Sequence, residues 1–239
     1  MRIAVISDIH GNLTALEAVI QDLKFTVPDV ILHGGDLTHG GSSSSDVVDR
    51  IMDLNWSGVV GNTDELLFRP ESLEEFAATR HHLSAVWSAT REIADFTRDQ
   101  LGSTRLSWLS SLPTIQTRED LTVVHARASD TWSSPSQHVT DTDLHLAYDA
   151  LGTQTVVFGH IHYPFIRVMP SLTVINTGSV SLSYDGDPRA AYLLLTDGAP
   201  ELRRVSYDVE REISAMEEKH MPHRAWISKI LLSAEPAMP

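Results

Sequence analysis

The chain begins with the sequence MRIAVISDIHGN at residues 1–12, which joins an apolar strand to a polar turn and the start of a helix. Residues 2–7 form a β-rich apolar run that predicts the strand. Apolar residues at helical spacing then follow from Leu13 to Leu23, with Asn12 as the expected N-cap. Polar residues directly beyond such a strand are expected at the carboxyl edge of a sheet, where open α/β folds form their sites.

Further strands and helices alternate along the chain. Residues 30–33 and 57–60 predict two more strands with a short helix between them, and this βαβαβ order implies a largely parallel sheet with covered faces. The later strands are predicted at residues 121–124, 155–158, 165–168, 172–175, 179–183, 190–195 and 202–206. We therefore predict a single α/β domain over residues 1–239, with two β-sheets packed face to face and helices outside.

Three segments depart from this alternation. Residues 64–112 carry apolar and aromatic residues at helical spacing, which predicts a helical insertion beside the site whose aromatic residues belong to the core. A C-terminal tail at about 208–239 starts with a polar helix at 208–218 and is expected to dock on the body or on a second subunit, as in a homo-oligomer. The Ser-rich loop at 126–138 is long for a compact domain and is a candidate substrate lid.

Composition and charge exclude several classes of function. The chain has no cysteine, which rules out disulfides, thiolate zinc sites and cysteine nucleophiles and fits a reducing, cytoplasmic location. No signal peptide is evident and no apolar run approaches the length of a membrane span, so we expect no membrane partner. A formal net charge of −14 repels nucleic-acid phosphates, so stable nucleic-acid binding is not expected.

Five short segments each end an apolar run in residue types that bind metals. They are Asp8-Ile9-His10, Gly35-Asp36, Gly61-Asn62, His125 and Gly159-His160-Ile161-His162. Each segment alone is a weak signal, but their joint occurrence at predicted strand ends indicates a two-metal site. Asp and Asn oxygens with imidazoles and no sulfur suit Mn, Fe, Zn, Co, Ni or Mg ions, with Mn favoured. Such a site points to hydrolysis of a phosphate ester.

The spacing within these segments supports the same interpretation. Because Asp8 and His10 are two residues apart, an extended backbone would point both side chains the same way. Asp36 has two carboxylate oxygens and could bridge two cations, which lie about 3.5–4 Å apart in dinuclear sites. Two divalent ions would also leave a local positive charge that attracts a phosphate ester to an acidic protein.

With these segments in place, the sequence resembles the calcineurin-like metallophosphoesterase superfamily. The resemblance runs from Met1 to about Tyr207, and the opening Ser-Asp-Ile-His-Gly-Asn is similar to bacterial phosphodiesterases related to symmetrical diadenosine tetraphosphatases. It implies a four-layer α/β/β/α sandwich and a metal-bridging hydroxide as nucleophile. It also implies one metal bound by Asp8, His10, Asp36 and His162, and a second bound by Asp36, Asn62, His125 and His160. A small phosphodiester or nucleotide is the expected substrate, as for a phosphodiesterase or a nucleotide pyrophosphohydrolase.

One position departs from the family pattern. Many members have a histidine directly after the asparagine ligand, where it protonates the leaving group, but this chain has Thr63 there. Threonine has no suitable pKa for that role, so we predict a preference for aryl or pyrophosphate leaving groups, which depart without strong protonation. His39 is the first candidate for a replacement acid and His33 the second.

Two further candidates for catalysis have an alternative structural interpretation. Asp64 is expected either to orient a water or ligand, or to cap a helix. Arg127 is expected either to clamp a phosphate oxygen or to lie solvated on the surface. The turn at residues 176–179 (Asn-Thr-Gly-Ser) resembles a family turn that supports the histidine ligands.

Two other functions use the same fold. A non-catalytic scaffold, like a related retromer subunit, has no need of every ligand, so the intact ligand set argues against it. A phosphomonoesterase or protein phosphatase needs an open groove and prefers monoesters.

Overall fold

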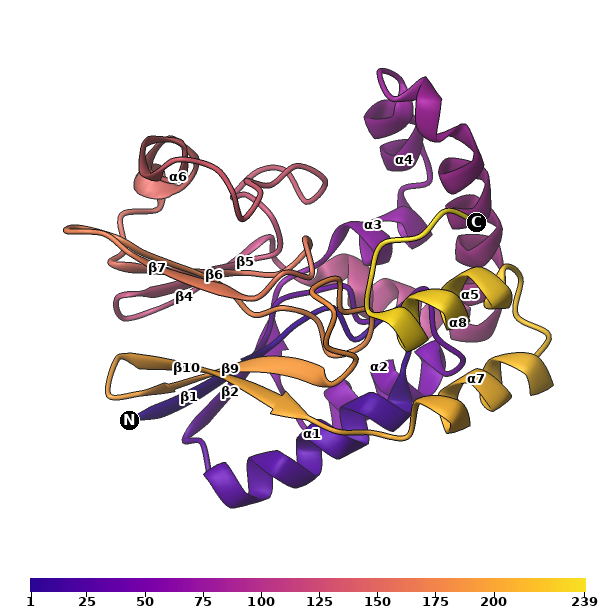
Figure 1. The fold of residues 1–239 in the computed structure, drawn as a ribbon, viewed down its shortest axis with the longest axis horizontal. Helices are drawn as coiled ribbons and strands as arrows, with labels where there is room; N and C mark the ends of the chain where they lie inside the picture. The colour runs from indigo at the N-terminus through magenta and orange to yellow at the C-terminus, as the bar shows by residue number, and fades with distance from the viewer.

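Two five-stranded mixed sheets form the centre of the computed structural model, which describes residues 1–239 (Figure 1). The first sheet has the order β10-β9-β1-β2-β3, in which β1, β2 and β3 are parallel and β9 and β10 are antiparallel. Its strands are β1 (Arg2–Ile6), β2 (Val30–His33), β3 (Ser57–Gly58), β9 (Ala190–Thr196) and β10 (Ala199–Val205).

The second sheet has the order β4-β5-β6-β8-β7, with parallel central strands and an antiparallel strand at each edge. Its strands are β4 (Ile115–Arg118), β5 (Leu121–Val124), β6 (Thr155–Phe158), β7 (Phe165–Val168) and β8 (Thr173–Asn176). The central parallel strands of both sheets run toward the same end of the molecule, where the helices that follow β3 and the two C-terminal helices gather (Figure 1).

Alternation along the strands builds the layers. Ile3 and Val5 of β1 join the apolar cluster between the two sheets, whereas Ala4 and Ile6 face the helices on the other side. Helices α1 (Leu13–Thr26) and α2 (Ser44–Asp53) cover the outer face of the first sheet, and α6 (Asp141–Tyr148) covers the second. This arrangement confirms the predicted four-layer α/β/β/α sandwich.

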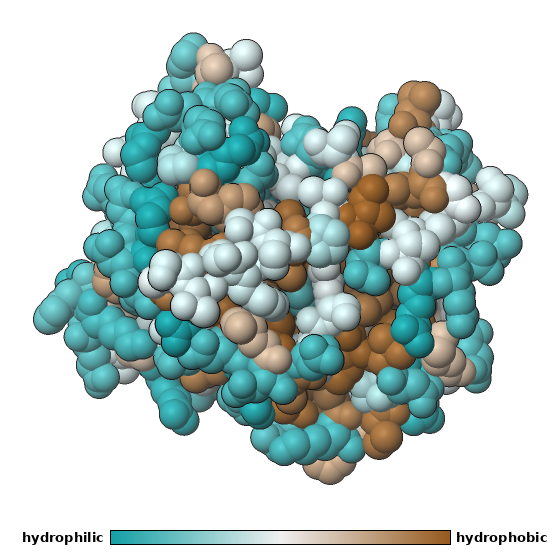
Figure 2. All heavy atoms as spheres, turned by 180° about the vertical axis from the view of Figure 1, so that it is seen from behind, coloured by the Kyte–Doolittle hydropathy of each residue, from teal (hydrophilic) through white to brown (hydrophobic).

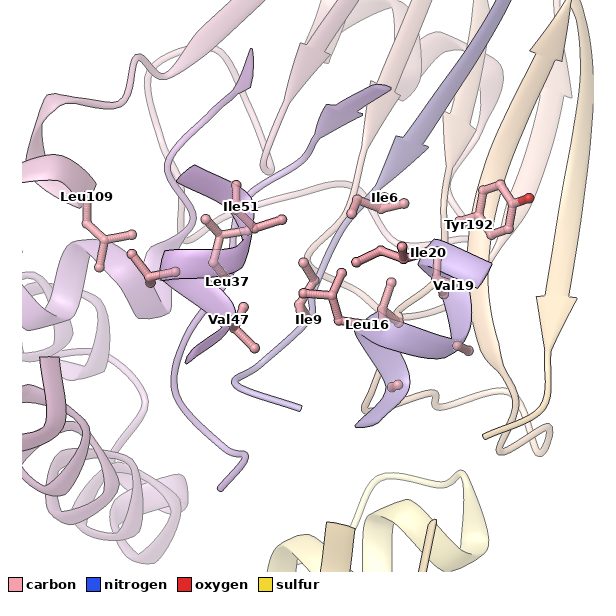
Figure 3. Packing of buried hydrophobic residues seen from close by; sticks show 14 of the residues in the cluster. Ile6, Ile9, Leu16, Val19, Ile20, Leu37, Val47, Ile51, Leu109 and Tyr192 are labelled. Carbon is pink, nitrogen blue, oxygen red and sulfur yellow. The ribbon is translucent and has the colours of Figure 1, made fainter. Parts of the chain in front are cut away.

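The core between α1 and the first sheet is well defined. Leu16, Val19 and Ile20 of α1 face Ile6 of β1 and Tyr192 of β9 (Figure 3). The amide of Ala15 donates to Asn12 Oδ1 over 2.9 Å, which confirms Asn12 as the N-cap of α1. The first strand and first helix are therefore packed together directly behind the segment that carries Asp8 and His10.

Two groups of helices lie at the carboxyl end of the sheets. The first follows β3 and comprises α3 (Asn62–Phe68), α4 (Glu71–Ala77), the short 3-10 helix η1 (His81–Leu83) and α5 (Ser84–Ser111), which is interrupted at Gly102. The second comprises α7 (Val209–Glu218) and α8 (Arg224–Ser233). Ile227 and Ile230 of α8 pack against Ile93 of α5, so the C-terminal helix docks on the body of the same chain.

The surface is mostly polar, as the acidic composition predicts. Figure 2 shows a depression between the lobe that carries α4 and the lobe that carries α6, with apolar side chains among polar ones. His81 and His82 are exposed. None of the helices combines the length and the apolar character needed to cross a bilayer.

Some predicted elements differ from the structure. Residues 179–183 were predicted as a strand but form a buried irregular segment, because the amides of Val180 and Ser181 bond to the carbonyls of Ser7 and Asp8 beyond the end of β1. The strand predicted at 57–60 covers only Ser57–Gly58. Strand β4, the 3-10 helix η2 (Asp149–Leu151) and the helices α6 and α8 were not predicted.

Candidate metal centre

The seven predicted metal ligands lie together at the carboxyl ends of the central strands. Asp8 and His10 follow β1, Asp36 follows β2, and Asn62 is the first residue of α3. His125 follows β5, and His160 and His162 follow β6. Strands from both sheets therefore supply ligands to one site, as the strand-end pattern in the sequence predicts.

The ligands divide into two groups of atoms. In the first group, His162 Nε2 lies 3.2 Å from Asp8 Oδ1 and 3.1 Å from His10 Nε2, which is 3.7 Å from Asp36 Oδ2. Asp8, His10 and His162 have ligand atoms close enough together to hold one ion.

The second group meets the first at the carboxylate of Asp36. His125 Nε2 lies 3.5 Å from Asp36 Oδ2 and 2.8 Å from Asn62 Oδ1. His160 Nδ1 lies 2.8 Å from the same asparagine oxygen and 3.2 Å from His125 Nε2. Asp8, Asp36 and His125 also have ligand atoms close enough to share an ion. This last group crosses the two ligand sets implied by the sequence resemblance, because Asp8 belongs to one set and His125 to the other, with Asp36 common to both.

The orientation of the histidines shows that this cluster suits cations. The Nδ1 atoms of His10, His125 and His162 donate to the backbone carbonyls of His39, Gly34 and Leu182 at 2.8, 2.8 and 2.6 Å. Each Nε2 atom is then left as a bare acceptor that faces other acceptors. Without a cation, the 3.1 Å approach of His10 Nε2 to His162 Nε2 would be repulsive.

The separations also suit ions of ordinary size. At ligand distances of about 2.0–2.2 Å, two ligands of one ion lie roughly 2.8–3.6 Å apart in octahedral or tetrahedral geometry. Most of the separations above fall in or close to that range. Carbonyl groups that orient metal-binding histidines in this way are the usual second layer of such sites.

Burial sets the protonation states that metal binding needs. Asp8, His10, Asp36, Asn62, His125 and His162 are buried, and His160 is half-buried. Burial lowers the pKa of His10 and of His160 to about 4, so both imidazoles are neutral near pH 7. Burial alone would raise the pKa of Asp8, but the facing side chains of His162, His125 and His10 together outweigh it and hold that pKa below its ordinary value.

A family model for the calcineurin-like phosphoesterase superfamily domain matches residues 1–198 of this chain. The chain belongs to this superfamily. The protein is therefore a phosphoric ester hydrolase. The intact ligand set agrees with an enzyme rather than a scaffold.

Similar proteins span nearly the whole chain of the phosphoesterase. The uncharacterised protein MJ0912 of Methanocaldococcus jannaschii is 28% identical, with 96% of each chain covered. The crystal structure of a metallophosphoesterase from Sphaerobacter thermophilus has a TM-score of 0.79 at 26% identity, covering 98% of this chain and 99% of that one. The hypothetical protein PH1004 of Pyrococcus horikoshii shares the fold, with a TM-score of 0.83 at 16% identity and 99% of each chain covered.

The backbone at the ligands differs from the extended one that was predicted. Asp8 and His10 have φ values of 58° and 51°, so they adopt left-handed conformations and do not continue the strand. Asp36, His160 and His162 are also left-handed, at 50°, 67° and 59°. Such conformations cost energy for residues other than glycine and concentrate at functional sites. The side chains converge because of this turn geometry, and Ile9 between the first two ligands is buried in the core.

Two glycines allow the carboxylates to approach the backbone closely. A Cβ atom at Gly61 would lie within 3.0 Å of the Asp36 carboxylate, and a Cβ atom at Gly159 would lie equally close to Asp8 Oδ2 and Ser7 Oγ. Only glycine fits at these two positions while the carboxylates keep their places.

The turn after β8 supports the ligands, as predicted. Asn176 Nδ2 donates to the carbonyl of Gly159, directly before His160. Ser179 Oγ donates to the carbonyl of Asp8 over 2.9 Å. The carbonyl partners at Gly34, His39 and Leu182 were not predicted, because the type of a residue does not reveal where its carbonyl points.

Asp64 lies beside the metal ligands but faces the protein. It is fully buried, and its Oδ1 accepts from the amide and the hydroxyl of Thr38 at 3.0 and 2.8 Å. Its Oδ2 accepts from the amides of Leu37 and Gly61 at 3.1 and 3.3 Å. The carboxylate thus ties the segment after Asp36 to the start of α3, where Asp64 is the third residue rather than the N-cap.

The remaining candidate residues differ in their burial and in the hydrogen bonds that they make. His39 is buried, and its Nε2–H donates to the carbonyl of Thr90 over 2.9 Å. His33 is buried with no hydrogen bond at either ring nitrogen. Thr63 Oγ1 donates to the carbonyl of Thr38, and its amide donates to Asp36 Oδ1 over 2.9 Å. The Arg127 side chain is exposed and makes no hydrogen bond or ion pair, so a phosphate-binding role stays a prediction.

Proposed function

We propose that the phosphoesterase hydrolyses small phosphodiesters at two divalent metal ions, with manganese favoured. The first ion would be held by Asp8, His10, Asp36 and His162, and the second by Asp36, Asn62, His125 and His160. The observation that carries this proposal is the inward orientation of bare acceptor atoms, above all the 3.1 Å approach of two imidazole nitrogens.

The protein's own groups prepare this chemistry. When bound, the ions would acidify a water that serves as the nucleophile and would neutralise the phosphate oxygens. The carbonyls that accept from Nδ1 hold the histidines in one tautomer and one orientation. Asp64 has the role of a positioning residue, because all four of its hydrogen bonds hold the segments that present Asp36 and Asn62.

A strong general acid is missing beside the ligands. Thr63 occupies the position where related enzymes have a histidine. His39 offers no free proton in its neutral form, since its N–H is used by the carbonyl of Thr90. We therefore propose that the enzyme prefers leaving groups that depart without protonation, such as phenolates.

The proposal can be tested with metal-stripped enzyme. After chelation and reconstitution with Mn²⁺, the wild type is expected to bind two ions per chain and to hydrolyse bis-p-nitrophenyl phosphate faster than p-nitrophenyl phosphate. Asp36→Asn should weaken the binding of both ions, whereas Asn62→Ala should weaken the binding of one. Absence of diester turnover in the metal-loaded enzyme would overturn the proposal, and a monoester preference would favour a phosphomonoesterase or protein phosphatase.

The leaving-group proposal has its own measurement. Rates for aryl phosphodiesters should rise steeply as the pKa of the leaving phenol falls. A flat dependence would show that an acid protonates the leaving group after all, and His39→Gln would then identify whether His39 supplies it.

The remaining expectations on partners also stay proposals. The net charge of −14 supports a small-molecule substrate over stable binding to nucleic acids. A cytoplasmic location rests on the cysteine-free composition. Formation of a homo-oligomer is proposed only as one way in which the C-terminal tail could be used, since α8 already packs on its own chain.

A further inference from the structure

A small cavity lies directly beside the metal ligands. It has a volume of about 180 Å³, and His10, Asn62 and His162 form part of its wall. This volume is below the roughly 300–1,000 Å³ of sites for drug-sized ligands, so it suits one ring-sized group rather than a whole dinucleotide. A group in this cavity would be attached to a phosphate at the metal centre.

Four aromatic residues from distant parts of the chain line the cavity. They are Trp87 of α5, Trp132 of the loop after β5, Tyr184 and Trp226 of α8. Loop residue Trp132 is buried, so this part of the predicted lid is anchored in the wall. Planar aromatic groups bind well between such side chains, because stacked or edge-to-face rings gain more than their buried area alone.

Hydrogen bonds hold two of these rings in place. Trp87 Nε1 donates to the carbonyl of Arg80 over 3.0 Å, and Trp226 Nε1 donates to the carbonyl of Ala237 over 2.8 Å. The ring of Tyr184 lies 4.7 Å from that of the ligand His162. The aromatic walls are therefore fixed relative to the metal ligands before a substrate arrives, which lowers the entropic cost of binding.

The indole of Trp132 differs from these two. Its Nε1 atom is buried and has no hydrogen-bond partner, although a buried N–H without an acceptor is costly. Its ring packs at 5.1 Å from Phe76, which keeps it in the cavity wall.

The charge of the cavity restricts what it can bind. Its lining contains no Asp, Glu, Lys or Arg. A second phosphate, as in a dinucleoside polyphosphate, would find no counter-charge there, and burying it unpaired would be expensive. A neutral group meets no such penalty.

We propose that this cavity is a subsite for a neutral, planar aromatic group of one ring system on the phosphoester substrate. This inference rests on the proposed phosphodiesterase function, and it specifies that aryl diesters are preferred over polyphosphates as substrates. The family match ends at residue 198, so the wall that Trp226 supplies comes from a segment outside it.

The test compares two diesters with the same leaving group. p-Nitrophenyl phenyl phosphate and p-nitrophenyl methyl phosphate release the same phenolate, so their ratio of kcat/KM reports recognition of the second substituent. The Mn²⁺-loaded wild type is expected to favour the phenyl diester. Trp226→Ala should reduce the ratio by about tenfold, the order of effect found when an aromatic stacking partner is removed.

Two further variants guard against loss of folding. Trp56→Ala removes a half-buried tryptophan that does not line the cavity and should keep the wild-type ratio. Val86→Trp, on the half-buried face of α5, should fill the cavity and lower the ratio without removing any packing. Equal rates for both diesters in the wild type, or a ratio unchanged in Trp226→Ala and Val86→Trp, would overturn the subsite while leaving the phosphodiesterase function intact.

A binding measurement separates failure of the subsite from failure of the proposed function. If neither diester is hydrolysed, the proposed function is wrong. Quenching of tryptophan fluorescence by diphenyl phosphate but not by dimethyl phosphate would still support the subsite. No quenching by either compound, or equal quenching by both, would overturn it.

Discussion

Replacing Asp64 with asparagine tests whether the site depends on a buried carboxylate that never touches a metal. The new side chain would keep one oxygen, and its amide group would take the place of the other, facing N–H donors. Two of the four hydrogen bonds to Leu37, Thr38 and Gly61 would then lose their acceptor. Hydrogen bonds to a charged group contribute about 1.5–3 kcal/mol each, so Asp64→Asn should lower the free energy of unfolding by about 3–6 kcal/mol.

The same change should weaken metal binding. Leu37 and Thr38 directly follow the shared ligand Asp36, and Gly61 precedes Asn62, so loosening them moves two ligands. Loss of a group that orients ligands typically costs 10–100-fold in metal affinity, and we expect that range for Mn²⁺. Because the defect lies in holding the ligands, saturating Mn²⁺ should restore most of the turnover.

Three measurements check this reasoning: urea denaturation of the metal-free protein, isothermal titration with Mn²⁺, and diester hydrolysis over a range of Mn²⁺ concentrations. Asp53→Asn is the matched control, since Asp53 is exposed and makes no ion pair, and its effect should stay within about 0.5 kcal/mol. If Asp64→Asn keeps the stability and the Mn²⁺ affinity of the wild type but loses turnover at saturating Mn²⁺, the positioning role is refuted and Asp64 acts on the reaction itself.

Three other perturbations have defined outcomes. Gly159→Ala should lower Mn²⁺ affinity at least tenfold, because its Cβ would displace Asp8, whereas Gly198→Ala, which faces open space, should leave the affinity unchanged in the same titration. Each Mn²⁺ ion bound at 100 times its dissociation constant should stabilise the fold by about 2.7 kcal/mol and raise the Tm by about 5–10 °C, and an unchanged Tm in calorimetry would contradict a metal site. Burial lowers the pKa of His33 to about 4 in the folded protein, whereas a histidine in the unfolded chain has a pKa of about 6.5 and is protonated first as the pH falls. This difference should lower the free energy of unfolding by about 3 kcal/mol in all as the pH falls from about 6.5 to about 4. His33→Leu should therefore gain stability over the wild type at pH 5, and more than at pH 7, in urea denaturation.

The ligands could be predicted from the sequence because they follow apolar strands one after another. Parallel strands deliver the residues after them to one edge, so a one-dimensional pattern of strand ends maps onto one place in space. The prediction was wrong in the local backbone: Asp8 and His10 converge through left-handed turns, which no alternation of residue types reveals. The segment 179–183 was mistaken for a strand because its apolar and polar residues alternate, although its amides bond to the chain beyond β1.

Other features depend on tertiary contacts that sequence patterns do not encode. The cavity wall combines residues as distant as Trp87 and Trp226, and helical spacing cannot distinguish an aromatic residue in the core from one beside a site. The edge strand β4 has a largely exposed sequence, so its pairing with β5 left no apolar signal. The order of residues around the metals was predictable, whereas the shape of the space above them was not.

The pairing of β1 with β9 also constrains how the chain is made. Arg2 pairs with Thr196, so one side of the first strand stays without its partner until nearly the whole chain has been synthesised. At about 5–20 residues per second, ribosomes need about 10–40 s to reach β9 after β1. During this interval β1 can pair with β2 alone, and its other edge is free to join strands of neighbouring chains. Since the last residues that orient the ligands, up to Leu182, also emerge late, ions would reach a complete site only near the end of synthesis.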